Sequence, residues 1–153
     1  MEGTFFITLD YLKQLGACRE GQREFQRVFP DGGEYQAILD RCADEGRVDF
    51  GSWLLNHIGA TNDVRIYEEK IDAPNRSIIF AGDIKLKSGA NVKFLFSGHS
   101  IEAGRGIEAG KDFCVFAGLN IKKSEWPIFA VVTAKEKPTN LISGYWKQRK
   151  NTL

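Results

Sequence analysis

The stretch that decides the fold covers residues 95–121 and reads LFSGHSIEAGRGIEAGKDFCVFAGLNI. Large apolar side chains recur at every sixth position, and glycine follows the first three of them at Gly98, Gly104 and Gly110. A period of six is even, so strand alternation keeps the same face inward from one unit to the next. Glycine permits a sharp corner or a positive φ between short strands. The pattern therefore predicts an apolar column made of Leu95, Ile101, Ile107, Phe113 and Leu119.

Such a repeat is typical of β-solenoids, in which short strands stack coil upon coil. The upstream residues 84–96 favour a different arrangement, because alternation on both sides of a turn at 88–91 predicts an antiparallel hairpin. The hairpin pattern predicts that Phe94 and Phe96 are buried, whereas the six-residue repeat predicts that Leu95 is buried. A strand that is buried on both faces would satisfy both patterns. Two architectures stay open: a short solenoid-like, β-helix-like stack and a twisted antiparallel sheet with glycine corners.

The first third of the chain predicts helices instead of strands. Apolar residues recur at helical spacing over 9–15, 19–29, 34–43 and 50–58, and Gly16, Gly46 and Gly59 follow as helix stops. Helices this short are marginal alone and need to pack on one another. We therefore expect an α+β chain with a helical module over residues 1–60, a bundle of about four short helices. It packs on a β-rich module over 61–153, as a separate unit or within one compact domain.

Composition narrows the setting of the chain. It has 153 residues, a net charge of +1 and three cysteines. A near-neutral chain has no general attraction for nucleic acid or anionic membranes. No apolar run approaches the roughly 20 residues of a membrane helix, and the N-terminus lacks a basic start before a cleavage site. An odd cysteine count without a CxxC pair favours reduced thiols. We expect a soluble cytoplasmic protein that binds no membrane.

The residues that could carry chemistry do not form a recognisable constellation. Cys42 and His57 lie on neighbouring predicted helices but have no third partner, and both fit a helical core face. His99 has one nearby carboxylate, fewer ligands than a metal site needs. The glycines around Arg105 match neither of the phosphate-binding motifs GxGxxG and GxxxxGK[ST]. In addition, no helix is predicted to follow them and supply its dipole. We therefore expect no enzymatic activity, no metal and no cofactor.

Two basic segments are candidate partner-binding residues. Arg19, Arg23 and Arg27 form one stripe on the second predicted helix, although Glu20 and Glu24 lie close enough to pair with them. The C-terminal end mixes aromatic and basic residues, as single-strand nucleic-acid binders do, although a last strand with a solubilising tail explains it equally. That segment contains Tyr145, Trp146, Lys147, Arg149 and Lys150.

A third charged group surrounds the end of the third predicted helix. It consists of Asp40, Asp44, Glu45 and Asp49, and it could engage a basic partner such as a nucleic-acid-binding channel. The group is too short to mimic a nucleic acid.

The N-terminal text resembles a small helical module of bacteriophage and prophage accessory proteins, a group that includes anti-CRISPR inhibitors. The resemblance rests on Ala17-Cys18, on Phe25 and Phe29, and on Trp53-Leu54-Leu55. The text SIEAGRGIEAG at 100–110 resembles the glycine-hexad repeats that accompany the module. This resemblance implies a phage-encoded, non-enzymatic protein that inhibits a bacterial defence complex by docking on it. The implied partner is a host defence protein or ribonucleoprotein complex in the host cytoplasm. The resemblance implies no particular functional residues.

Two other functions remain as alternatives. Exposed strand edges could make the chain a structural protein that self-associates, and a homodimer is expected because a short β-stack must cover its ends. A small-molecule-binding protein would need a deep polar pocket around His99 and Arg105.

Overall fold

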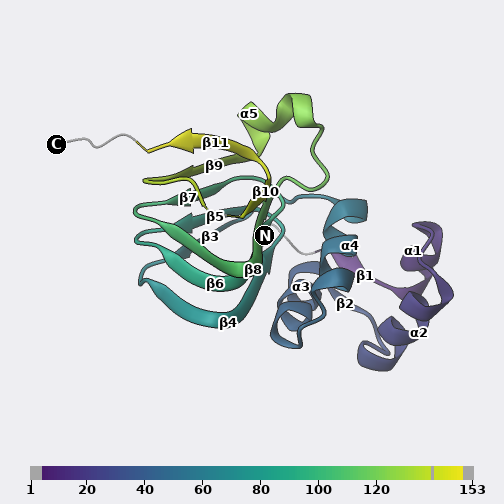
Figure 1. Ribbon diagram of the computed structural model, residues 1–153. Helices are drawn as coiled ribbons and strands as arrows, with labels where there is room; N and C mark the ends of the chain where they lie inside the picture. The colour runs from purple at the N-terminus through teal and green to yellow at the C-terminus, as the bar shows by residue number, and fades with distance from the viewer. Residues whose placement is uncertain (1–4, 139, 150–153) are drawn as a thin grey trace.

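The computed structural model shows a helical module beside a stack of parallel strands (Figure 1). It describes residues 5–138 and 140–149, with the backbone alone for residues 108–113. The α+β class is confirmed, with short helices first and parallel strands after them. No helix in the described part of the chain is long and apolar enough to cross a membrane.

Four helices and one short strand pair make up the helical module. The helices are α1 (Leu9–Gln14), α2 (Arg19–Val28), α3 (Tyr35–Asp44) and α4 (Val48–Ile58), and the antiparallel strands are β1 (Phe6–Ile7) and β2 (Gly33–Glu34). The Thr8 hydroxyl caps α1, and the Glu34 carboxylate accepts from two amides at the start of α3. Gly16, Gly46 and Gly59 follow helices at positive φ, as their helix-stop positions predict.

The C-terminal module is a short parallel β-solenoid. One sheet has the strand order β10-β8-β6-β4 and the other β11-β9-β7-β5-β3, and every described pair within them is parallel. The solenoid-like prediction is confirmed and the antiparallel alternative is wrong. The strands are β3 (Val64–Tyr67), β4 (Ile71–Phe80), β5 (Asp83–Leu86), β6 (Ala90–Ser97), β7 (Ile101–Ala103), β8 (Ile107–Ala117), β9 (Val131–Ala134), β10 (Leu141–Ser143) and β11 (Tyr145–Gln148). Between β8 and β9 lie the 3-10 helix η1 (Lys123–Glu125) and α5 (Trp126–Phe129).

The predicted hairpin over residues 84–96 is a corner of the solenoid. Its two strands, β5 and β6, belong to different sheets and do not pair with each other. The turn signal at 88–91 therefore marks a bend between sheets within one coil. A hairpin and a coil corner need similar turn residues, so local composition cannot separate them.

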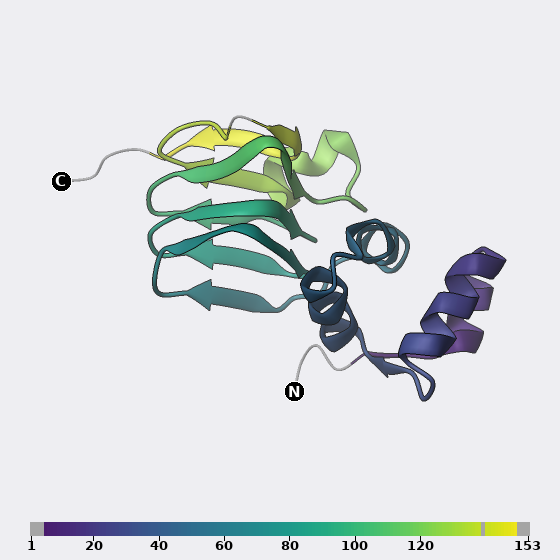
Figure 2. The ribbon, with the colours of Figure 1, turned by 60° about the horizontal axis from the view of Figure 1, so that its bottom comes forward.

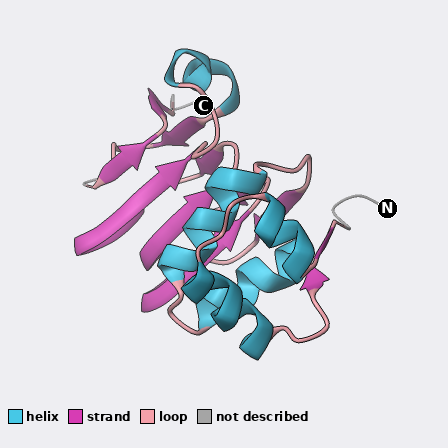
Figure 3. Cartoon of the chain, turned by 90° about the vertical axis from the view of Figure 1, so that its right-hand side faces the viewer, coloured by secondary structure: helices cyan, strands magenta, loops and turns pink. Residues whose placement is uncertain are grey.

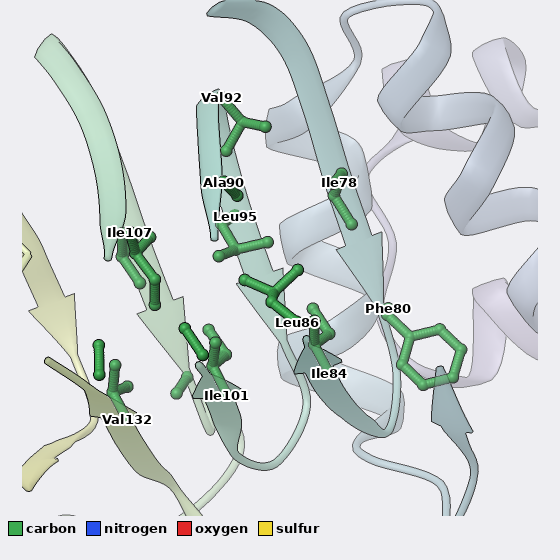
Figure 4. Close-up of a cluster of buried hydrophobic side chains, with 14 of the residues drawn as sticks. Ile78, Phe80, Ile84, Leu86, Ala90, Val92, Leu95, Ile101, Ile107 and Val132 are labelled. Atoms are coloured by element: carbon green, nitrogen blue, oxygen red, sulfur yellow. The ribbon is translucent and has the colours of Figure 1, made fainter. Parts of the chain in front are cut away.

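The six-residue repeat runs around the coil and not along the stack. Leu95, Ile101 and Ile107 are all buried in the solenoid core, as predicted, but they belong to successive strands. The stacked partners are further apart in sequence: Ile84 lies beside Ile101, and Leu95 lies beside Val115. Figure 4 shows Ile84, Leu95 and Ile101 among the side chains gathered inside the coil. The side chain of Phe113 lies outside the described residues, and Leu119 packs on the helical side.

Two of the hexad glycines, Gly98 and Gly104, are needed for close approach between coils. Gly98 and Gly104 do not have positive φ. Of the two reasons that predicted glycine at these positions, a sharp corner or a positive φ, the second is therefore wrong. A Cβ added at Gly104 would overlap the carbonyl oxygen of Lys87 in the coil below, whereas one added at Gly106 would meet no atom. The backbone therefore passes its neighbour at Gly104 at a distance that no other residue allows.

The two modules are joined because β4 and β6 are buried on both faces and so contribute to two hydrophobic cores. Ile78 and Leu95 point into the solenoid, whereas Ile79 and Phe96 belong to the helical cluster with Leu54. The sequence predicted that residues 94–96 are buried on both faces of the strand. This is confirmed for Leu95 and Phe96, whereas Phe94 is half-buried. Figure 3 shows the helices gathered in front of the strands.

Polar contacts fix the first coil to α3. The Gln36 side-chain amide donates to the Ile79 carbonyl and accepts from the Ala81 amide, both at 2.9 Å. It thereby takes the place of a neighbouring strand at the edge of the sheet. Asp40, one turn further on, makes a two-pronged ion pair with Arg65 of β3 at 3.0 and 3.2 Å. The Arg65 guanidinium also lies over the Phe80 ring, which closes the lower end of the core.

Exchange of one glycine at a time tests the close approach. Gly104→Ala is expected to lower the free energy of unfolding by about 2 kcal/mol or more, because the new methyl group forces two coils apart. Gly106→Ala, two residues away in the same corner, is the matched control and should change it by less than about 1 kcal/mol. Urea unfolding curves measure both. Equal losses in the two variants would contradict a specific role for Gly104.

Candidate functional site

The exposed face of α4 carries a stack of three aromatic rings. Phe50, Trp53 and His57 lie on one side of the helix, each within four residues of the next. The centroid distance is 6.3 Å for Phe50 and Trp53 and 4.0 Å for Trp53 and His57, with nearly parallel planes. His57 Nδ1 lies 2.9 Å from the Trp53 carbonyl oxygen, which fixes the imidazole on the indole. The result is a ridge of aromatic surface along α4.

One groove runs between this ridge and α2. Figure 2 shows α1 and α2 as a layer set beside α3 and α4. The groove has a volume of about 530 Å³, and small residues at the start of α2 form its floor opposite Phe50. Its lining residues are Ala17, Cys18, Glu20, Gly21, Glu24, Arg47, Asp49, Phe50 and Trp53.

A second groove lies on the other side of α4, above the outer face of the sheet. The volume is about 400 Å³, and Phe94, Phe96 and Phe116 form its floor. Phe96 and Phe116 stack at 4.5 Å with their planes 5° apart. Phe96 is buried under the helices, whereas Phe94 and Phe116 stay half-buried. The complete lining is Asp49, Ser52, Trp53, Asn56, Phe94, Phe96, Phe116 and Leu119.

The two grooves form one continuous surface, which we call the α4 surface. Asp49 and Trp53 line both grooves. Aromatic side chains with accessible faces beside small cavities are typical of protein-binding sites, where large rings become anchors. The half-buried aromatic rings that line the α4 surface have the chemistry for docking another molecule.

Ion pairs hold the rim of the α4 surface in place. Arg47 binds Glu24 and Glu45, and Arg27 also binds Glu24. Hydrogen bonds from Arg27 and then Arg47 lower the pKa of Glu24 to about 2. Hydrogen bonds from Arg41 and Arg47 likewise lower the pKa of Glu45. The arginines therefore neutralise these carboxylates and join α2 to the loop before α4.

The predicted basic stripe lies on α2 and is partly paired. Arg19, Arg23 and Arg27 are exposed, and Arg27 forms the ion pair with Glu24 that the spacing allows. None of the three lines either groove of the α4 surface. The predicted acidic group is also divided: Asp40 pairs with Arg65 and Glu45 with Arg41, while Asp49 reaches the grooves.

The second predicted segment is the last strand of the solenoid. Trp146 packs against the solenoid core, whereas Tyr145 and Lys147 are exposed on the opposite side of β11. Arg149 pairs with Glu102 at 3.2 Å, and Lys150 lies outside the described residues. Figure 1 places β11 and α2 at opposite ends of the molecule, so these two predicted segments do not form one site.

The α4 surface was missed at the sequence level. Trp53 and Leu54 suggested only a helix packed on others, and Phe94 and Phe96 suggested a buried strand face. The available signal was the set of aromatic residues at 94, 96 and 116, which lie on the neighbouring strands β6 and β8. Which rings remain accessible depends on where α4 crosses the sheet.

The candidate chemical residues are kept apart. Cys42 is buried in the helical core, and burial raises the pKa of its thiol to about 12, whereas His57 is exposed. His99 precedes β7 and Arg105 follows it, and the cavity of about 200 Å³ beside His99 is not lined by Arg105. No group of three metal-ligating side chains gathers within the described ranges.

Comparison with known proteins identifies the helical module alone. Residues 1–61 match the family model of the YdhT N-terminal domain, and this match ends just after α4. No curated protein and no solved structure matches the chain. The helical part of the resemblance described above therefore has a family counterpart over residues 1–61, and its phage and anti-CRISPR part stays a prediction.

The ion pairs of Glu24 predict a pH dependence. Because the folded-state pKa of Glu24 is lowered, its contribution to stability is present above about pH 4.5 and is lost as the pH falls toward 2. Glu24→Gln should therefore destabilise the protein at neutral pH and converge with wild type at the acid end of that range. Arg47→Gln should weaken this dependence. Thermal melts from pH 2 to 7 measure it, and a gap independent of pH would contradict the ion-pair assignment.

Proposed function

We propose that the chain is a non-enzymatic binding protein that docks on another protein through the α4 surface. The observation that supports this proposal is that the half-buried rings of Phe50, Trp53, Phe94 and Phe116 line two neighbouring grooves. The shared core under Ile79 and Phe96 holds α4 and the sheet in a fixed relation, so the surface is organised before a partner arrives.

The proposed partner is a host defence protein or ribonucleoprotein complex, which the chain inhibits in the bacterial cytoplasm as anti-CRISPR proteins do. This part of the proposal rests on the resemblance of Ala17-Cys18, the two phenylalanines of α2 and Trp53-Leu54-Leu55 to phage accessory proteins. The match of residues 1–61 to the YdhT N-terminal domain supports the presence of a recurring helical module. Inhibition by docking requires only that the chain covers a surface which the partner needs.

A second candidate is self-association through a strand edge, which would make the chain a homodimer or an assembly protein. The observation in its favour is β3, an edge strand on which Val64 and Ile66 are 49% and 50% exposed. A monomer by light scattering over a wide concentration range would remove this candidate, whereas it would leave the docking proposal intact.

A pull-down from a defence-proficient host, followed by an interference assay, tests the proposed function. Wild type should capture a host protein and reduce interference against an infecting phage. Trp53→Ala should lose both effects while it keeps the folded circular dichroism spectrum, since it removes a central aromatic anchor. Phe129→Ala is the matched control, because Phe129 of α5 is an exposed aromatic residue that lines neither groove. Capture of no partner by wild type, or equal loss in both variants, would contradict the proposal.

A further inference from the structure

Negatively charged side chains outnumber positively charged ones in the lining of the α4 surface. Three carboxylates, Glu20, Glu24 and Asp49, line the two grooves, and Arg47 is the single cation in either lining. Arg47 is already held between Glu24 and Glu45, and Arg27 occupies Glu24 as well. Glu20 and Asp49 are exposed and make no ion pair among the described side chains. The surface therefore has a negative rim around aromatic grooves.

This rim restricts what can cover the grooves. A neutral or acidic apolar segment would bring Glu20 and Asp49 out of water without a counter-charge, which is costly. A lysine or arginine beside them would pair with these carboxylates.

We infer that the α4 surface binds a basic, amphipathic segment of the partner protein. Apolar side chains of that segment enter the groove over Phe94 and Phe116 and the groove beside Phe50, while its basic side chains face Glu20 and Asp49. This inference rests on the proposed docking function and names the chemistry of the partner. It assigns no role to the basic residues of α2 and β11.

Two synthetic peptides test the inference directly. Both have 18 residues and the same helical pattern of leucines, with lysine at the polar positions of one peptide and glutamate at those of the other. Each carries fluorescein, and fluorescence anisotropy measures its binding to the full chain at physiological salt. The leucine–lysine peptide should bind at least tenfold more tightly than the leucine–glutamate peptide.

Variants locate that binding. Glu20→Gln with Asp49→Asn should weaken the leucine–lysine complex at least tenfold, and Trp53→Ala should weaken it similarly. The matched control is Glu69→Gln with Glu136→Gln, which removes the same charge at two exposed positions outside both grooves. It should change the dissociation constant less than twofold. Circular dichroism confirms that each variant is folded.

Equal binding of the two peptides, no binding of either, or equal weakening by the two double variants would overturn the inference. These failures differ from failure of the proposed function. If Trp53→Ala still abolishes capture of the host partner while the peptides fail to bind selectively, docking at the α4 surface stands and the basic character of the partner is wrong.

Discussion

The structure depends on one alternation, at Ile78 and Ile79 in the first long strand of the solenoid. Ile78 fills the coil, and Ile79 points the other way into the helical module, with both side chains almost completely buried. Because successive strand residues face opposite sides, a single strand can close two cores at once. Ile79 also limits how α4 can pack, since a Cβ added at Gly51 would meet its side chain. The helices therefore sit where the strand places them, and the α4 surface follows from that position.

The ends of the solenoid show how so few coils are stable. Residues at the stack ends lose one neighbour, which would leave the core exposed. At the lower end Arg65 lies over Phe80 and binds Asp40 of α3. Burial lowers the pKa of Arg65, but the hydrogen bond with Asp40 raises it, and the pKa is raised overall. At the upper end Trp146 packs on the core. The helical module thus stabilises the solenoid, and the solenoid completes the core of the helices.

Much of this fold could be predicted from local chemistry. Helical spacing and glycine stops gave the four N-terminal helices to within two residues, whereas η1 and α5 were not predicted. The direction of the strands could not be predicted, because parallel pairing joins residues such as Ile84 and Ile101 that no short pattern relates. The α4 surface was missed for the same reason. Phe94 and Phe116 are accessible only because α4 stops short of covering them, and that is a property of packing. The basic residues of α2 and β11 could be recognised in the sequence as charge patterns. A charge pattern does not predict which side chains line a groove.

We expect the helices and the solenoid to unfold as one cooperative unit, because β4 and β6 contribute to both of their cores. Hydrogen exchange of wild type and Ile79→Ala, followed by mass spectrometry, measures this cooperativity most directly. Ile79→Ala should speed exchange in α3 and α4 and in β4, β6 and β8 by similar factors, because this side chain joins the helices to the strands. Faster exchange in the helices with unchanged protection of β6 and β8 would contradict the account, since the two modules would then be independently stable.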